Sequence, residues 1–284
     1  MCAAFTHDWL SRKPYREFHP RLRAALERLT AWPEPERYDE LVQLVPHAPD
    51  VSIPRFVTQS PQASSEAGGY EQHVATRRAV PTRPEDWHDF WNMIVWAHFP
   101  KLRWALNAIH VDPETGPIDP RNRRTPAQNL ATTFDESGML VVSTSKRVLE
   151  ELRALRFKVA FWDYRDEQLA STRFYFVGHG MLESLLVPRA GLTARSLLLH
   201  VPELPELEAS DAQRFELDAF VANRIDSWRT SRPILDPIPV LAIPGFSDNA
   251  AAEFYDDPRN IRFVPISRRP HAEIESLAAA PLRT

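Results

Sequence analysis

The stretch WHDFWNMIVWAHFPKLRWALNAIH, residues 87–110, decides the fold of this chain. Its apolar residues recur every three or four positions, a spacing typical of a helix, and Pro100 interrupts them. The stretch therefore predicts two consecutive helices, over residues 83–99 and 101–109. Polar side chains this dense in an apolar segment must be paired or used, because burying an unpaired polar group costs kilocalories.

Four polar side chains of this stretch share a face within each helix. His88 and Asn92 are four residues apart, and Asn107 and His110 are three apart. A chain reversal at Pro100 would bring both pairs into one cleft, and we expect all four there. Two imidazoles and two amides suit a metal ion or a polar substrate. The alternative is that they only cross-link the helices through satisfied hydrogen bonds.

A histidine between two glycines forms a second candidate site. His179 follows the apolar run 174–177, which predicts a strand, and it begins a predicted helix with Gly178 and Gly180 on either side. Glu183 shares its helical face four residues later. We interpret Glu183 as orienting the His179 imidazole for acid–base chemistry. The alternative is an ordinary pair at the start of a helix.

Adjacent carboxylates occur in a predicted hairpin over residues 131–144. Its turn would be Asp135-Glu136-Ser137-Gly138, with the glycine at the position that wants a positive φ. Asp135 is a candidate acid or ligand, although turn chemistry alone also explains an aspartate at that position.

Arginines of a proline-rich loop over residues 111–126 form a candidate anion site. Arg121, Arg123 and Arg124 lie there, and we take Arg124 as a contact to a small polar or anionic molecule. A solvated loop is the alternative. The residue types leave the identity of any cofactor or metal open.

Composition excludes several classes of protein. The chain of 284 residues is 43% hydrophobic and 25% charged, which is typical of a soluble globular protein. Its net charge of −4 argues against nucleic acid as a partner, and no apolar run is long enough to span a membrane. The single cysteine, Cys2, excludes a disulfide framework and favours a reducing cytoplasm.

These patterns together predict an α+β fold, mainly helical, with a small antiparallel sheet in a single domain. We expect an N-terminal helical segment over residues 1–50, a core domain over 51–265 and a tail over 266–284. Residues 233–244 alternate Pro with Ile, Leu and Val, which predicts a proline-rich belt in extended form packed on the core.

Several blocks of the chain resemble the bacterial domain-of-unknown-function family 3025. The resemblance runs from about Ile53 to Val264 and implies a bacterial origin but no activity. The blocks besides residues 87–110 are Gly69-Tyr70-Glu71, Val80-Pro81-Thr82-Arg83, residues 133–138, residues 176–183, residues 243–246, Asn249 and residues 254–257. The chain departs from the family at Asn129, where members tend to have an acidic residue, and at Gly180-Met181, where they tend to have Ala-Leu.

We therefore expect a cytoplasmic protein with one polar cleft that performs acid–base or metal-assisted hydrolytic chemistry on a small polar molecule. The candidate catalytic residues are His88, His110, Asp135, His179 and Glu183, and the candidate ligand-binding residues are Asn92, Asn107 and Arg124. The alternative is a non-catalytic binding or interaction module in which these groups only lock helices. Catalysis requires a solvent-reachable site, whereas locking requires buried and mutually paired groups.

Overall fold

A computed structural model describes residues 5–59, 69–112, 124–207, 209–231, 233–261 and 274–276. The chain forms two compact units. The first unit takes residues up to 11, residues 15–135 and residues 206–232, and the second takes residues 12–14, 136–205 and those from 233 onward. Because the chain enters each unit more than once, neither unit is one continuous segment. The expected limits at residues 50 and 265 stay predictions.

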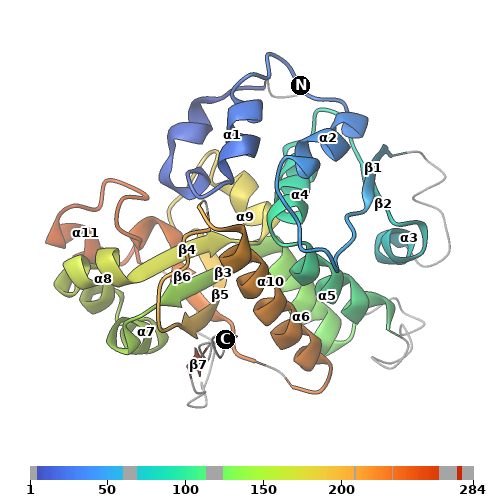
Figure 1. Ribbon diagram of the computed structural model, residues 1–284. Helices are drawn as coiled ribbons and strands as arrows, with labels where there is room; N and C mark the ends of the chain where they lie inside the picture. The colour runs from blue at the N-terminus through green and yellow to red at the C-terminus, as the bar shows by residue number, and fades with distance from the viewer. Residues whose placement is uncertain are drawn as a thin grey trace, which may run out of the picture. The chain divides into compact units, whose positions relative to one another are not determined.

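The first unit is mainly helical (Figure 1). Its helices are η1 (Asp8–Ser11), α1 (Pro20–Leu26), η3 (Pro35–Arg37), α2 (Tyr38–Gln43), α3 (Gly69–Arg77), α4 (Trp87–His98), α5 (Pro100–Val111), α6 (Pro126–Ser137), α10 (Asp211–Asp226) and η6 (Ser227–Arg229). Strands β1 (Arg55–Thr58) and β2 (Ala79–Thr82) pair in parallel. The last two residues of α6 belong to the second unit, and η2 (Lys13–Tyr15) likewise runs from one unit into the other. Within the described ranges, no helix combines the length and the apolar character needed to cross a bilayer.

The predicted helix pair is confirmed as α4 and α5. Asp86 caps α4 by accepting a hydrogen bond from the Asp89 N–H at 3.1 Å, and Pro100 occupies the first turn of α5. The Asp218 carboxylate of α10 accepts the N–H groups of Lys101 and Leu102, both at 2.9 Å. These bonds satisfy backbone donors that the start of a helix leaves without helical partners.

Aromatic side chains fill the core of the first unit. Trp91 is fully buried, stacks on Tyr15 with ring centroids 5.0 Å apart, and meets Trp9 edge-on at 4.8 Å. Trp96 and Trp104 also meet edge-on, at 4.9 Å. Rings that contact one another in this way contribute packing energy and require no stacked base or ligand.

The second unit contains a five-stranded sheet in the order β4-β3-β5-β6, with β7 paired to β5. The strands are β3 (Gly138–Ser143), β4 (Thr172–Phe176), β5 (Thr193–His200), β6 (Asp236–Pro239) and β7 (Glu275–Ser276). The helices are α7 (Lys146–Arg153), η5 (Val159–Asp163, a π-helix), α8 (Arg165–Ser171), α9 (His179–Ser184), η7 (Val240–Ala242) and α11 (Ala252–Asp256). The fold is α+β, as predicted.

The sheet of the second unit is mixed rather than purely antiparallel. Strand β3 is antiparallel to β4 but parallel to β5, and β5 is antiparallel to β6. A parallel pair requires a long crossover, and residues 144–192 provide it between β3 and β5. Helix α7 packs on β3, β5 and β6.

The first strand and the turn of the predicted hairpin are wrong. Residues 131–134 lie in α6, because Ala131 and Phe134, three positions apart, both point into the core from one helical face. The segment Asp135–Gly138 is therefore the end of a helix and the start of β3, not a hairpin turn, and Gly138 is not among the positive-φ glycines. Residues 159–163 form the π-helix.

The proline-rich belt packs on the core of the second unit as predicted. Leu235, Ile238 and Val240 are buried, while Ile234 and Leu241 are half-buried. Its central residues form β6 and η7, so only part of the belt is extended. The pairing of β6 with β5 explains why these prolines occur at a sheet edge, where a missing N–H donor is tolerated.

Candidate functional site

Two asparagines of the first unit hold the first turn of α3. Asn92 of α4 donates from Nδ2 to the Tyr70 hydroxyl at 3.0 Å. Asn107 of α5 donates from Nδ2 to the Glu71 carbonyl at 2.9 Å and to Glu71 Oε2 at 2.6 Å. Both asparagines are buried. The two predicted ligand-binding residues therefore bond to adjacent residues of α3, Tyr70 and Glu71.

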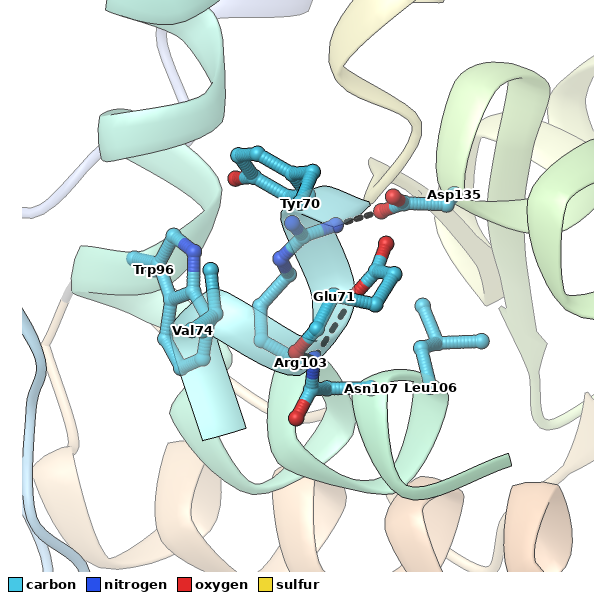
Figure 2. Close-up of a pocket in the computed structure, with 8 residues that line it drawn as sticks. All are labelled: Tyr70, Glu71, Val74, Trp96, Arg103, Leu106, Asn107 and Asp135. Carbon is cyan, nitrogen blue, oxygen red and sulfur yellow. Dashed lines mark hydrogen bonds and ion pairs between the residues drawn. The ribbon is translucent and has the colours of Figure 1, made fainter. Parts of the chain in front are cut away.

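A small pocket lies beside this network, also within the first unit (Figure 2). It encloses about 210 Å³, part of which is open to solvent, and is lined by Tyr70, Glu71, Val74, Trp96, Arg103, Leu106, Asn107 and Asp135. Figure 2 shows the Arg103 guanidinium reaching towards Asp135, with which it forms an ion pair. The Arg103 side chain is only 4% exposed and that of Asp135 is 15% exposed. Breaking such a buried pair leaves an uncompensated charge, so the pair holds α5 to α6.

Burial shifts the pKa values of Tyr70 and His110, near this pocket, in the direction that favours their neutral forms. Burial of its hydroxyl raises the pKa of Tyr70 to about 12, although part of the residue is exposed. Burial lowers the pKa of His110, and the Glu71 carboxylate opposes that shift. His110 is half-buried, and its carbonyl accepts a hydrogen bond from Gln128 at 3.1 Å.

His88 and Arg124, also predicted from the sequence, do not line this pocket. His88 is half-buried in the first turn of α4. Arg124 is exposed, and its carbonyl accepts a weak bond from Asn129 at 3.4 Å. Arg121 and Arg123 lie outside the described residues. Asp135, predicted as an acid or ligand, does line the pocket and forms an ion pair with Arg103.

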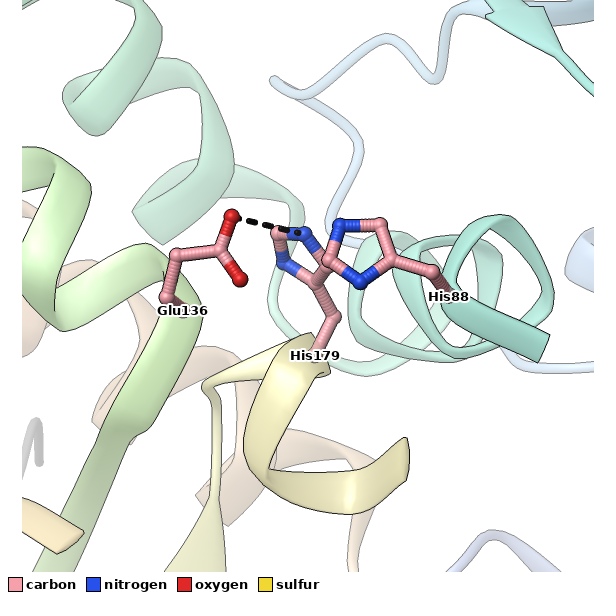
Figure 3. Close-up of side chains that lie close together, drawn as sticks. All are labelled: His88, Glu136 and His179. Carbon is pink, nitrogen blue, oxygen red and sulfur yellow. Dashed lines mark ion pairs between the residues drawn. The ribbon is translucent and has the colours of Figure 1, made fainter. Parts of the chain in front are cut away.

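The second unit brings a histidine and a carboxylate together. His179 is the first residue of α9, directly after β4 and the short link 177–178, and its side chain is 6% exposed. Glu136, in the last turn of α6, has a side chain that is 47% exposed. Figure 3 shows the carboxylate and the imidazole facing one another, with His179 Nε2 3.7 Å from Glu136 Oε1. His88, also labelled in Figure 3, belongs to the first unit.

Close backbone packing holds this pair of residues in place. A Cβ at Gly178 would lie 2.3 Å from the Gly138 nitrogen and 2.7 Å from the Glu136 carbonyl oxygen. The Gly178 N–H donates to the Gly138 carbonyl at 2.9 Å. Only glycine allows this approach, which brings the start of α9 against the end of α6. The predicted importance of a histidine between glycines thus has a local physical cause.

The sequence did not identify Glu136 as the residue that faces His179. Glu183, chosen for its i, i+4 spacing, is half-buried one turn further along α9. Glu136 was assigned to a hairpin turn, and the signal that would have placed it correctly is the helical spacing of Ala131 and Phe134. Tyr70 and Glu71 were also missed as pocket residues, although they occur in one of the family-like blocks.

Residues 54–264 match the model of a family described as "Protein of unknown function (DUF3025)". Because this match spans well over half of the sequence, the chain belongs to that family. No curated protein and no solved structure matches the chain significantly.

Proposed function

We propose that this member of the family hydrolyses a small polar or anionic molecule at Glu136 and His179. One observation carries the proposal: an imidazole that is almost fully buried has its Nε2 3.7 Å from a carboxylate that solvent still reaches. An imidazole beside a solvent-reachable carboxylate is a common arrangement for water activation. The glycine packing around Gly178 keeps both side chains on fixed backbone.

The proposed reaction is the addition of water across one bond of the substrate. The Glu136–His179 pair promotes loss of a proton from a bound water molecule. The resulting hydroxide bonds to an electrophilic carbon or phosphorus atom, the bond to the leaving group breaks, and the leaving group takes up the proton. We expect this chemistry in the cytoplasm, in keeping with the single cysteine.

Hydrolysis of model substrates tests this proposal. The purified protein is assayed with p-nitrophenyl acetate, p-nitrophenyl phosphate and bis-p-nitrophenyl phosphate, with and without added Zn²⁺. His179→Asn should lower kcat/KM for any hydrolysed substrate by about 100-fold or more, the usual contribution of a water-activating group. His200→Asn is the matched control, because His200 lies half-buried on β5 of the same unit and outside this pair.

Thermal unfolding of the same variants separates function from structure. We expect His179→Asn to retain a melting curve close to that of the wild type. A wild type without turnover on any of the three substrates, or a His179→Asn variant that hydrolyses them at the wild-type rate, overturns the proposal.

A helix-locking role is favoured for the polar residues of the first unit. Asn92 and Asn107 are buried and hydrogen-bonded to α3, and Arg103 is paired with Asp135. This is the arrangement that the non-catalytic alternative requires. The catalytic roles of His88 and His110 stay predictions, and the same hydrolysis assay on His88→Asn and His110→Asn tests each of them.

A further inference from the structure

The separation of the two side chains in the second unit fits a shared metal ion. His179 Nε2 and Glu136 Oε1 are 3.7 Å apart, which is too long for an N–H···O hydrogen bond. Zinc ligands lie about 2.0–2.2 Å from the metal, so two ligands at a tetrahedral angle are roughly 3.3–3.6 Å apart. The observed separation requires only a slightly wider angle at the metal.

We propose that Glu136 and His179 together bind one divalent transition-metal ion through Oε1 and Nε2. This proposal rests on the proposed hydrolytic function and specifies how the pair activates water. With two protein ligands, the other coordination positions take water and substrate oxygen atoms.

The ligand atoms determine which metals bind. Imidazole nitrogen suits Zn²⁺, Co²⁺ and Ni²⁺, whereas Mg²⁺ and Ca²⁺ prefer oxygen ligands throughout. One imidazole and one carboxylate therefore favour the transition metals. We expect affinity to rise from Mn²⁺ through Co²⁺ to Ni²⁺, with Mg²⁺ weakest.

The absence of a side chain at Gly180 leaves room for the Glu136 carboxylate. A Cβ at Gly180 would lie 2.5 Å from Glu136 Oε2 and 3.1 Å from the Glu136 carbonyl oxygen. The closest atom is the end of a flexible side chain, so Gly180→Ala should displace the carboxylate, while the Glu136 carbonyl has to give by only a few tenths of an ångström. At Gly178, in contrast, the closest atoms are backbone. Gly180 is thus a positioning residue for the proposed ligand Glu136.

Metal titration of tag-free, chelator-treated protein tests the site. Zn²⁺ binding is measured by isothermal titration calorimetry, and Co²⁺ binding by its visible absorption, which reports the coordination geometry. The wild type should bind one ion per chain. His179→Asn and Glu136→Gln should each weaken binding by about 10-fold or more, because even outer-shell changes cost 10–100-fold.

Two further variants separate ligand geometry from folding. Gly180→Ala should weaken Zn²⁺ binding and change the Co²⁺ spectrum while its melting temperature stays near that of the wild type. His200→Asn, which alters another histidine of the same unit, should bind Zn²⁺ and Co²⁺ as the wild type does.

The outcomes distinguish this inference from the hydrolytic function. A wild type that binds no stoichiometric Zn²⁺ or Co²⁺, or Glu136→Gln and His179→Asn variants that bind both as the wild type does, overturns the metal site. If turnover depends on His179 but survives chelator treatment, the metal site fails and the hydrolytic function stands. If Zn²⁺ binds through both residues but no substrate is hydrolysed, the site stands and the hydrolytic function fails.

Discussion

The polar network of the first unit and the Glu136–His179 pair of the second differ in how their polar atoms are used. In the network, Asn107 donates to two oxygens of Glu71, and the buried Arg103 is paired with Asp135. In the pair, the two nearest polar atoms are 3.7 Å apart and the carboxylate is 47% exposed. The denser collection of polar residues is therefore the one whose side chains bond across helices. A polar motif in an apolar segment first indicates cross-linking, and a reactive site is better sought where an imidazole lies near a carboxylate that solvent reaches.

The largest effect is expected from removing the edge of the sheet that supports the pair. Ending the chain at residue 232 deletes β6 and η7 and removes the buried side chains of Leu235, Ile238 and Val240. Three buried apolar side chains contribute several kcal/mol, so the melting temperature should fall by about 10 °C or more. Differential scanning calorimetry measures the change. An unchanged melting curve would show that the belt does not stabilise the second unit.

Breaking the network should lower stability and leave metal binding intact. Arg103→Met leaves the Asp135 carboxylate without its buried partner, and we expect a loss of about 3–5 kcal/mol in the free energy of unfolding. Urea titration at pH 7 measures this loss, with Arg28→Met, an exposed arginine of the same unit, as the control. If Arg103→Met is as stable as the wild type, the network does not lock the helices.

Acid should destabilise the first unit through His98. Its Nδ1 donates to the Ile94 carbonyl at 2.8 Å, and its Nε2 accepts the His19 N–H at 2.9 Å, so the folded state requires a neutral ring. Burial lowers the pKa of His98 from 6.5 to about 3. The unfolded chain therefore binds a proton below pH 6.5 while the folded chain does not.

The contribution of the neutral His98 to the free energy of unfolding is fully present above pH 6.5. It is lost as the pH falls towards 3, by about 1.4 kcal/mol per pH unit. Burial also lowers the pKa of His19 and of His47, which add to the slope. Urea unfolding at several pH values should give a shallower dependence for His98→Gln. An identical pH dependence of the free energy of unfolding in wild type and variant would show that His98 does not cause the loss of stability in acid.

The smallest effect distinguishes the two glutamates near His179. Glu136 Oε1 lies 3.7 Å from His179 Nε2, and Glu183 is the partner that helical spacing alone suggests. Glu183→Gln should therefore weaken Zn²⁺ binding less than Glu136→Gln does. Titration calorimetry on both variants compares their Zn²⁺ affinities directly. A larger loss of affinity in Glu183→Gln than in Glu136→Gln would support Glu183 as the partner of His179.

The sequence predicted the local elements of this protein better than its long-range pairs. Helices α4 and α5 follow from apolar spacing and Pro100, because both signals act within a few residues. The helix α6 was missed because Gly138 and the acidic residues before it imitate a turn. The approach of Glu136 to His179 depends on packing between segments about 40 residues apart, which no local pattern encodes.

The central claim is that Glu136 and His179 carry the chemistry while the asparagine network carries stability. Measuring the free energy of unfolding and the Zn²⁺ affinity of His179→Asn and Asn107→Ala side by side tests it most directly. We expect Asn107→Ala to lose about 1–3 kcal/mol of stability and to bind Zn²⁺ as the wild type does. We expect His179→Asn to stay within about 1 kcal/mol of the wild type and to lose Zn²⁺ binding. Loss of binding in Asn107→Ala at unchanged stability, or wild-type binding in His179→Asn, would contradict the claim.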